Sequence, residues 1–189
     1  MTSTSLLVMD VQQGIVDRVG GEEAQEYLSR LAGAVRAARG AEIRVIYVII
    51  GFRAGYPEVS ERNKSFAAAA RTGRMAEGDP GSAIHPAVAP AAGDVIVTKR
   101  RVSAFTGSDL EVVLRAADVD HLVLTGIATS GVVLSTLRQA ADLDFGLTVL
   151  SDLCADNDPE THRVLMDKVF PRQAAVMTAA EWIEASSAD

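Results

Sequence analysis

Cysteine, positive charge and long apolar runs are scarce in this chain, and each shortage excludes a class of protein. Among the 189 residues there is one cysteine, Cys154. A single cysteine excludes a disulfide framework and a cysteine-rich zinc site, and it fits a reducing compartment. It also leaves one thiol for any chemistry that needs a thiolate nucleophile.

The shortage of basic residues argues against nucleic acid as a partner. Asp and Glu number 25 against 18 Lys and Arg, a formal net charge of -7, whereas nucleic-acid-binding domains carry a basic surface. No apolar run approaches the ~18 residues of a membrane span. The first residues, MTSTS, lack the basic start of a signal peptide. We therefore expect a cytoplasmic protein that binds neither nucleic acid nor membranes.

The remaining composition is that of an ordinary globular domain. Hydrophobic residues make up 48% and charged residues 23%, which excludes a disordered or collagen-like chain. A chain of this length corresponds to about one domain and buries ~70% of its unfolded surface. That is enough for a hydrophobic core that needs no disulfide bonds or structural metal. We predict one domain over residues 1–189.

Short apolar runs alternate with longer amphipathic segments along most of the chain. The runs predict about six strands, and the segments between them predict helices. Strands are expected at 6–9, 43–50, 94–98, 121–125, 146–150 and 174–177, and helices at 22–39, 108–117, 130–143, 159–169 and 179–185. Gly40 is expected to end the first helix in a left-handed conformation. Solid apolar strands alternating with helices predict an α/β protein, a three-layer α/β/α sandwich around a doubly wound parallel sheet.

Residues 51–93 interrupt this alternation. They hold four of the six prolines and an Ala-rich segment from Phe66 to Ala70. The composition predicts a long loop excursion that carries one short helix and has too little apolar content for a core of its own. Long loops inside compact domains are frequently lids or binding segments, so we expect this one to help select a ligand.

Side chains that carry chemistry follow the predicted strands. In an open parallel sheet the ligand site lies beyond the carboxyl ends of the strands. Those positions hold Asp10 and Gln12, then Lys99–Arg101, then the glycine-flanked turn Gly126–Gly131, and finally Asp152. An acid, an amine and a helix start at one edge predict a functional site. Each feature also has a purely structural interpretation. Asp10 could cap a turn, Lys99–Arg101 could be a solvated run of charges, and Gly126–Gly131 could be a tight connection between a strand and a helix.

Taken in order, four segments of the chain resemble the isochorismatase-like (cysteine hydrolase) superfamily. They are Leu7–Gln12 (LVMDVQ), Lys99–Phe105 (KRRVSAF), Leu124–Thr129 (LTGIAT) and Leu150–Asp152 (LSD). The resemblance implies an α/β/α fold, a catalytic Asp at Asp10, a catalytic Lys at Lys99, and assembly into dimers or tetramers. It also implies a non-proline cis peptide at Ile127–Ala128, in a turn that forms an oxyanion hole at the helix start. That turn comprises Ile127, Ala128, Ser130, Gly131 and Val132.

The chain departs from the superfamily at the residue for which the superfamily is named. In cysteine-using members the nucleophile lies six residues after the glycine that matches Gly126, and here that position is Val132. Valine has no nucleophilic atom, so amidase, nicotinamidase and carbamoylase activities lose support. Isochorismatase-type members can carry glycine there. Valine is larger than glycine, so Val132 also narrows the space for the ring of a chorismate-like substrate. Cys154 lies past the fifth predicted strand, where a small thiol is a common core residue.

Other nucleophiles have little support in the sequence. Thr129, Ser130 and Ser135 lie near the turn, but no histidine falls in a motif beside it. A Ser-His-Asp arrangement is therefore not expected. Ser130 is interpreted as the helix N-cap.

The histidines are too scattered to predict a metal site. His85, His121 and His162 lie in different segments and lack zinc-ligand spacing. Nicotinamidase-like members of the superfamily carry an Asp-x-His pair after the second strand, where this chain has Gly51-Phe52-Arg53. We expect no metal and no other cofactor.

Three functional hypotheses remain, in decreasing order of support. The first is an isochorismatase-like hydrolase that acts on a small anionic metabolite by acid and water chemistry, as in vinyl-ether hydrolysis. Asp10 would transfer the proton, with Lys99 as its electrostatic partner. The residues expected to bind substrate are Gln12, Arg101 and Phe105. The second is a non-catalytic binding or assembly protein on the same fold. The third is an amidase-type cysteine hydrolase that uses another residue, such as Cys154.

Overall fold

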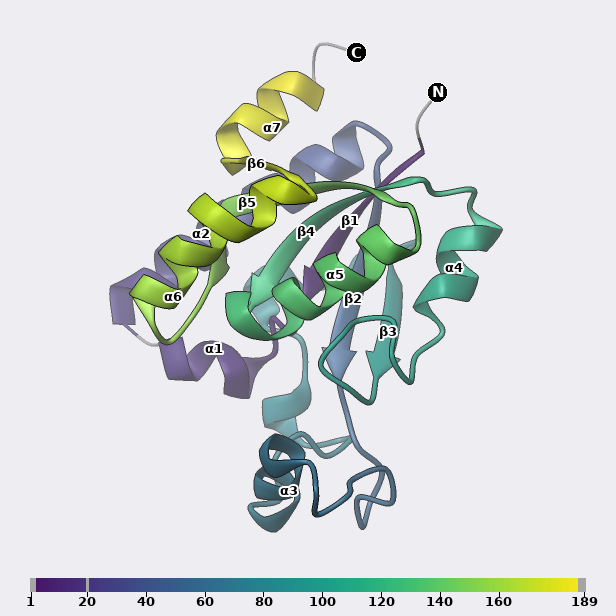
Figure 1. Cartoon of the computed structure of the whole chain (residues 1–189), viewed down its shortest axis with the longest axis vertical. Coiled ribbons are helices and arrows are strands. Elements are labelled where there is room, and N and C mark those ends of the chain that lie inside the picture. The colour runs from purple at the N-terminus through teal and green to yellow at the C-terminus, as the bar shows by residue number, and fades with distance from the viewer. Residues whose placement is uncertain (1–2, 20, 187–189) are drawn as a thin grey trace.

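The structure is a computed structural model, and it describes residues 3–19 and 21–186. One sheet of six parallel strands has the order β3-β2-β1-β4-β5-β6 (Figure 1). The strands are β1 (Thr4–Met9), β2 (Arg44–Ile50), β3 (Val95–Lys99), β4 (His121–Ile127), β5 (Gly146–Ala155) and β6 (Ala175–Met177). The topology confirms the doubly wound α/β fold predicted from the apolar runs.

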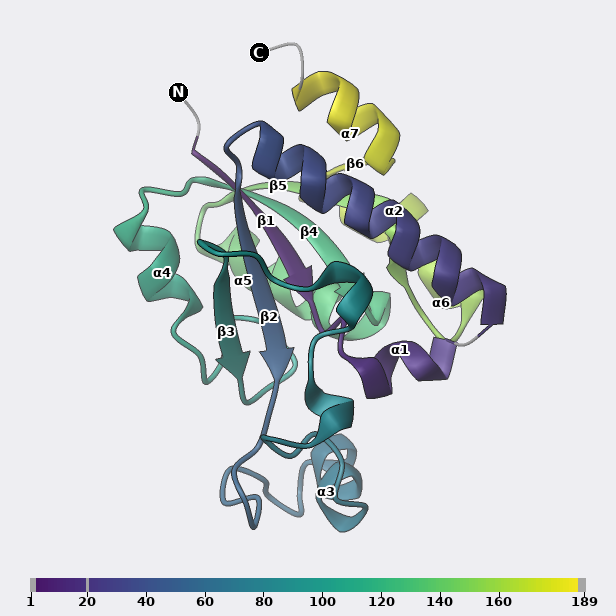
Figure 2. The ribbon, with the colours of Figure 1, turned by 180° about the vertical axis from the view of Figure 1, so that it is seen from behind.

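Helices cover both faces of this sheet. They are α1 (Gln13–Val19), α2 (Gly21–Gly40), α3 (Lys64–Arg71), α4 (Leu110–Ala116), α5 (Leu134–Asp142), α6 (Pro159–Val164) and α7 (Ala179–Ser186). Shorter helical turns occupy Pro80–Ser82, Pro86–Val88, Thr129–Val133, Leu165–Val169 and Phe170–Arg172. Figure 1 shows α4, α5 and α6 on one face, and Figure 2 shows α2 and α7 on the other. Across the described ranges, none of the helices has both the length and the apolar content needed to cross a bilayer.

Alternation along the central strand β1 supplies a core on each face. Leu7 and Met9 pack into the cluster beneath α4 and α5, while Leu6 and Val8 pack into the cluster beneath α2 and α7. Successive side chains of a strand point to opposite faces, and each of these four is at most 1% exposed. Burial of one such side chain stabilises the fold by ~1.5–3 kcal/mol. Because both faces are covered, the strand is an unbroken apolar run in the sequence.

Helix α2 ends differently from the prediction for Gly40. Gly40 is its last helical residue, and the left-handed residue is Glu42, with φ 58°. The Ile43 N–H donates to the Ala38 carbonyl at 2.8 Å, and the Glu42 N–H donates to the Arg39 carbonyl at 3.2 Å. These two bonds form a Schellman motif. The prediction was wrong because the helix extends further than a left-handed Gly40 would allow. The carbonyls that need donors are those of Ala38 and Arg39, and the left-handed residue that lets the chain satisfy them is Glu42, two residues after Gly40.

Two elements near the carboxyl edge of the sheet differ from their predicted bounds. Helix α1, directly after β1, was not predicted. Strand β5 continues past Leu150, so Asp152 and Cys154 lie inside the strand and not after it. The pairing of β5 with β4 shifts register between Leu124 and Gly126. This irregularity carries the strand beyond the point where its apolar run stops.

Residues 51–79 form a knob that projects beyond the carboxyl ends of β2 and β3, and the rest of the segment returns over the α2 face of the sheet, where Val88 joins the core beneath α2 (Figures 1 and 2). Its α-helix is α3, in agreement with the single short helix predicted for this segment. Phe52 packs edge-on against Phe66, with 5.2 Å between the ring centroids. Arg100 Nη1 lies 2.6 Å from Glu77 Oε1 and ties the knob to the residues after β3. The knob is therefore anchored by a small apolar cluster and an ion pair.

Candidate functional site

A buried ion pair lies where the carboxyl ends of β1 and β3 come together. Asp10 follows β1, and Lys99 is the last residue of β3. The long lysine side chain spans the intervening strand, so that its Nζ lies 2.9 Å from Asp10 Oδ2. Nζ also donates to the Arg101 carbonyl at 3.0 Å. Asp10 is 6% exposed and Lys99 is 1% exposed, so the pair is almost completely shielded from water.

The environment of Asp10 makes its carboxyl group a weaker acid than an exposed aspartate. Burial raises the pKa of the carboxyl group, and the nearby charge of Lys99 lowers it by a smaller amount. Among the described residues, Asp10 Oδ1 has no hydrogen-bond partner. One carboxyl oxygen is thus held by an ammonium group while the other is unpaired. Such a group is suited to exchange a proton with a bound molecule.

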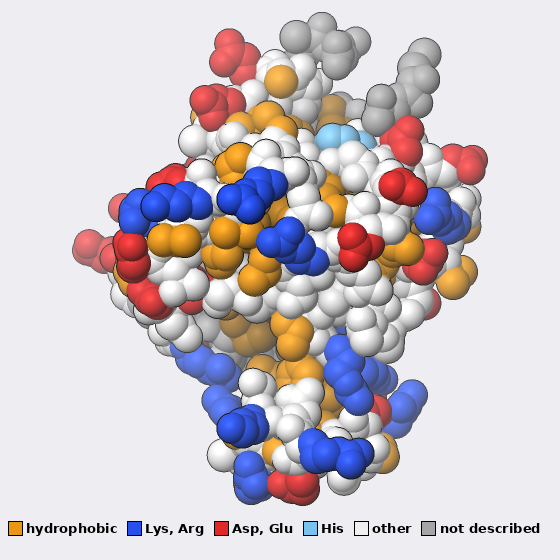
Figure 3. Space-filling view, in the orientation of Figure 1, with side chains coloured by type: hydrophobic (Ala, Val, Ile, Leu, Met, Phe, Trp, Pro, Cys, Tyr) orange, Lys and Arg blue, Asp and Glu red, His pale blue; other side chains and the backbone are white. Residues whose placement is uncertain are grey.

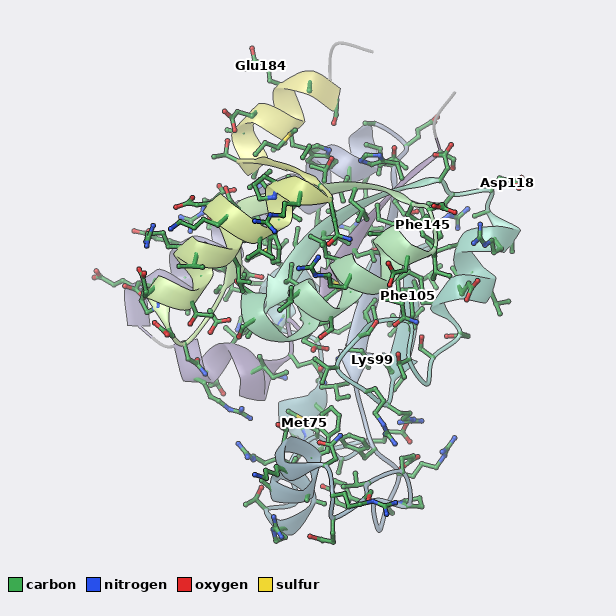
Figure 4. The ribbon with its side chains drawn as sticks, in the orientation of Figure 1. Met75, Lys99, Phe105, Asp118, Phe145 and Glu184 are labelled. Atoms are coloured by element: carbon green, nitrogen blue, oxygen red, sulfur yellow. The ribbon has the colours of Figure 1, made fainter. Side chains whose placement is uncertain are left out.

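The ion pair lines a cavity of ≈ 180 Å³, called the first cavity below. Its lining residues are Asp10, Ile15, Arg18, Ile50, Phe66, Met75, Lys99, Val102, Ile127, Ala128, Gly131, Val132 and Asn157. Figure 4 shows Lys99 at the edge of the sheet that faces the knob, on which Met75 lies. Apolar side chains are visible at the waist between sheet and knob in Figure 3, with basic side chains to either side. The first cavity therefore has the ion pair at one end and mostly apolar walls.

The turn after β4 forms one wall of the first cavity. Gly126 has φ 145°, and a Cβ atom there would lie 2.3 Å from the Met9 carbonyl oxygen. Only glycine permits this approach of β4 to β1, because any side chain would collide with the backbone. The next peptide bond, between Ile127 and Ala128, is cis, as the resemblance implies.

Most of the turn residues named from the sequence face the first cavity, but Ser130 does not. Those that line it are Ile127, Ala128, Gly131 and Val132. The helical turn begins at Thr129, and the residue before it, Ala128, makes no side-chain cap. Ser130 instead presents its backbone N–H to Asp156 Oδ2 at 2.7 Å. The interpretation of Ser130 as the N-cap was wrong, because a carboxylate from beyond β5 satisfies this helix start.

Val132 and Cys154 occupy different environments. Val132 is buried and lines the first cavity, whereas Cys154 lies on β5 and does not line it. Cys154 Sγ lies 3.9 Å from the Leu124 carbonyl oxygen. Burial raises the pKa of this thiol strongly, so it stays protonated. The thiol of this chain is therefore separate from the Asp10–Lys99 pair and unactivated.

The three residues expected to bind substrate lie outside the first cavity. The Gln12 side-chain amide donates to the Ile50 carbonyl and its oxygen accepts from the Ile50 N–H, so it holds the chain after β2. The Arg101 guanidinium donates to the Glu58 carbonyl at 3.0 Å. Phe105 packs in the core, 6.0 Å from Phe145 between ring centroids. The geometry gives these residues structural contacts, and their role in binding stays a prediction.

The structure adds cavity residues that the sequence did not indicate. Arg18 on α1 is the most informative, because it is the cation at this cavity other than Lys99. Burial and the charge of Arg74 both lower the pKa of Arg18, so two guanidinium groups lie near one another. Arg18 was missed because α1 itself was not predicted. An amphipathic pattern directly after Asp10, with Ile15 facing inward, was the available signal.

One histidine does lie beside the turn, contrary to expectation. His162 Nδ1 lies 2.8 Å from Thr129 Oγ1, although the two residues are far apart in sequence. Thr129 is fully buried and does not line the first cavity, so the pair holds the turn in place. In the part of the chain that the structure describes, no group of three or more His, Cys, Asp or Glu side chains is arranged to hold a metal ion.

Comparison with known proteins agrees with this architecture. Residues 4–181 match the family described as the Isochorismatase domain. The chain is 31% identical to the uncharacterized isochorismatase family protein YecD of Escherichia coli O157:H7, over 97% of this chain and 96% of that protein. It is 34% identical to the ureidoacrylate amidohydrolase RutB of Methylobacterium radiotolerans, over 88% of this chain and 73% of that enzyme. Among solved structures, a cysteine hydrolase from Pseudomonas syringae pv. phaseolicola superposes with a TM-score of 0.89 at 25% identity, covering 98% of this chain and 93% of the other. The chain therefore belongs to the isochorismatase family.

Proposed function

We propose that this protein is a hydrolase that acts on a small anionic metabolite through Asp10 and water, without a thiolate. The observation that carries the proposal is the buried Asp10–Lys99 pair, with 2.9 Å between its charged atoms, in a cavity lined by Val132 and by no cysteine. An acid with a raised pKa is suited to proton transfer near neutral pH. The amidase-type alternative needs a thiolate, and Cys154 is buried elsewhere with a raised pKa.

The expected reaction is the hydrolysis of a vinyl ether. Protonated Asp10 gives its proton to the enol carbon, which leaves positive charge on the adjacent carbon and its ether oxygen. Water adds to that carbon and returns a proton to the Asp10 carboxylate. The resulting hemiketal then breaks its carbon–oxygen bond to release an alcohol and a carbonyl compound. Lys99 orients the carboxyl group through Oδ2, and we expect the turn from Ala128 to Val132 to offer backbone N–H donors other than that of Ser130, which already donates to Asp156.

The first cavity supports a small substrate that carries negative charge. Arg18 lies at this cavity, and the charges of Asp10 and Lys99 offset one another, so the lining has a net positive charge. A guanidinium group binds a carboxylate through charge-assisted hydrogen bonds. RutB acts on ureidoacrylate, which is itself a carboxylate. The cavity volume of ≈ 180 Å³ and the Val132 side chain limit the size of the substrate.

The test is a panel of carboxylate-bearing vinyl ethers and ureido acids, assayed with the native chain and with Asp10→Asn. We expect turnover of a vinyl ether and a loss of ~10²–10⁴-fold in Asp10→Asn, the usual contribution of a general acid. Asp17→Asn, an exposed position on α1, is the matched control and should leave turnover within twofold. Alkylation with iodoacetamide should leave turnover intact.

Two results would overturn the proposal. Turnover unchanged in Asp10→Asn would remove the acid role, and loss of turnover on alkylation would point to a thiol mechanism. A third result, tight binding of carboxylates by the native chain and by Asp10→Asn with no turnover of either class, would identify a binding protein on the same fold. Light scattering on a sizing column tests the predicted dimer or tetramer independently of activity.

A further inference from the structure

One edge of the sheet is open. Strand β3 is the last strand on its side, and no strand among the described residues pairs with its outer edge. Figures 1 and 2 show no strand beyond it, with α4 as the outermost helix on that side. A groove of ≈ 620 Å³ opens at this edge, lined by Arg53, Ile96, Thr98, Arg100 and residues 107–109. The groove shares no lining residue with the first cavity, so it lies outside the proposed catalytic site.

Two residues of β3 turn their backbone hydrogen-bonding groups toward the open edge. The Gly51 N–H donates to the Lys99 carbonyl at 3.3 Å, so the backbone groups of Lys99 face β2. Because these groups alternate in direction along a strand, those of Val97 also face β2, whereas those of Ile96 and Thr98 face outward. Each of the two outward residues supplies one N–H and one C=O. The edge therefore carries two donors and two acceptors that no other described strand uses.

The usual protection of an edge strand is missing from β3. Natural proteins guard an open edge with lysine or proline on the strand, with a bulge, or by keeping the strand very short. Residues 95–98 are VIVT, β-branched throughout, and their register with β2 is regular. Lys99 is turned inward to Asp10. At the opposite edge β6 has only three residues, so β3 is the edge that can accept another strand.

Exposed apolar side chains lie near the same edge. Among the described residues, the exposed large hydrophobic side chains are Ile96 at 50%, Val102 at 38% and Val112 at 70%. Val102 lies at the first cavity, but Ile96 and Val112 belong to β3 and α4, the two elements at the open edge (Figure 1). Isolated exposed apolar residues need no explanation. Two of them on adjacent elements, beside unpaired backbone groups, indicate a surface that a partner covers.

We propose that this partner is a second copy of the chain, whose β3 pairs antiparallel with β3 of the first about a twofold axis at Val97. The two sheets then form one continuous sheet. Ile96 lies opposite the partner's Thr98, and Thr98 lies opposite the partner's Ile96, so all the outward groups of both copies bond to one another. A register shifted by two residues would instead place one of them opposite Asp94 or Arg100, whose N–H groups already donate within their own chain. The chain thus supplies its own complement.

The charged groups near the edge favour the antiparallel arrangement. Arg53 and Arg100 line the groove at the carboxyl end of β3, and Asp118 lies on the same side of the molecule toward the amino end (Figure 4). A parallel pair would bring the arginines of the two copies together, whereas antiparallel copies keep them apart and bring them toward the partner's Asp118. Both arginines already have acids in their own copy, Glu58 and Glu77, so the gain is mainly avoided repulsion.

The experiment measures molar mass by light scattering on a sizing column across micromolar concentrations, and we expect the native chain to be a dimer. Ile96→Lys places two ammonium groups close to the axis and should raise the dimer dissociation constant ~100-fold. Ser65→Lys adds the same charge at an exposed position of α3 and should change it less than about twofold. Thr98→Pro removes an outward N–H and spares the ladder to β2, so it should also dissociate the dimer, whereas Thr98→Val should not.

Disulfide formation tests the register. The double variant with Ile96→Cys and Thr98→Cys should form a covalent dimer under mild oxidation, because the Cα atoms of an opposed, hydrogen-bonded pair lie ~5.5 Å apart. Each single variant meets its own equivalent only diagonally, at ~7–8 Å, and should crosslink at least ~10-fold more slowly. Cys154 is buried and protonated, so the native chain is the blank.

A monomeric native chain would overturn the proposal and leave the edge to a strand of a different protein. A dimer that persists in folded Ile96→Lys and Thr98→Pro would place the interface on another face, and equal dissociation by Ser65→Lys would indicate only diffuse repulsion; both would overturn it. Crosslinking of Ile96→Cys alone at the rate of the double variant would do the same, because it requires a different register. Circular dichroism and the thermal midpoint check the fold of each variant. None of these results depends on whether the first cavity is catalytic.

Discussion

The first cavity holds an acid and an amine 2.9 Å apart without a thiol, whereas a second cavity, of ≈ 310 Å³ between α2, the end of β5 and the start of α6, holds the chain's one thiol among carboxylates. Residues of the turn after β4 line the first cavity, and two lining residues of the second hydrogen-bond to that turn, yet the cavities have opposite electrostatic character. In the first, one carboxylate is matched by one ammonium group and burial raises the pKa of Asp10. In the second, the acids outnumber the cation and the thiol is protonated. A thiol is therefore not a nucleophile by its presence alone, since its surroundings decide its ionisation.

Removing the cation of the first cavity is expected to have the largest effect. Lys99→Met leaves the Asp10 carboxylate buried and unpaired, which should lower the free energy of unfolding at pH 7 by ~3–5 kcal/mol. The deficit should shrink as the pH falls, because protonation removes the charge. Urea unfolding measures both. Glu23→Gln at the exposed rim of the second cavity is the control and should stay within ~0.5 kcal/mol. Equal losses in the two variants would show that the cavities do not differ in burial.

Moving a thiol into the first cavity tests whether location controls reactivity. In Val132→Cys the new thiol lies near Lys99, which favours the thiolate, so iodoacetamide should modify it ~100-fold faster than Cys154. Mass spectrometry of the digested protein assigns the modified site. Val133→Cys is the matched control, since Val133 is equally buried but does not line the cavity. Comparable rates for Cys154 and the new thiol would contradict the contrast between the two cavities.

The sequence predicted the parts of the molecule that depend on local pattern. Leu6–Met9 is apolar because β1 is covered on both faces, so the strand and the acid after it were both recognisable. Asp10 and Lys99 were placed at one edge because parallel strands bring their carboxyl ends together. The family motifs added the cis peptide before Ala128. The fold and the shared edge of Asp10 and Lys99 were thus accessible without coordinates, whereas the spacing alone did not establish that the two side chains pair.

Features that depend on contacts between distant residues were not accessible. The partnership of Thr129 with His162 and the role of Asp156 at Ser130 arise because β5 extends past its apolar run and brings α6 back to the turn. No local signal marks that extension, since Ser151 and Asp152 are polar. Arg18 was missed for a simpler reason: α1 is short, and its helical pattern covers barely two turns.

The net positive lining of the first cavity gives a test with a smaller expected effect. Butyrate should bind the first cavity, and Arg18→Gln should weaken it about fivefold to tenfold through loss of a charge-assisted hydrogen bond. Arg44→Gln, exposed at the start of β2 and far from the carboxyl edge, is the control. Calorimetry with butyrate gives the dissociation constants of the native chain and of both variants. Butyrate affinity that is insensitive to Arg18 would remove the argument for an anionic substrate.

The smallest effect concerns acid stability at the second cavity. Burial lowers the pKa of His162 below its ordinary value of 6.5, while Asp156 and Asp167 act in the opposite direction with smaller effects. The folded state then binds fewer protons than the unfolded state, so stability from this group is present above pH 6.5 and is lost as the pH falls through the lowered pKa. His121 has the same sign, so the variant His162→Gln is needed to separate the two. Urea unfolding at pH 7.5 and 5.5 should show a smaller loss on acidification in His162→Gln than in the native chain, because glutamine cannot acquire the charge. An identical loss would place the pH sensitivity at His121, on the edge of the sheet remote from both cavities.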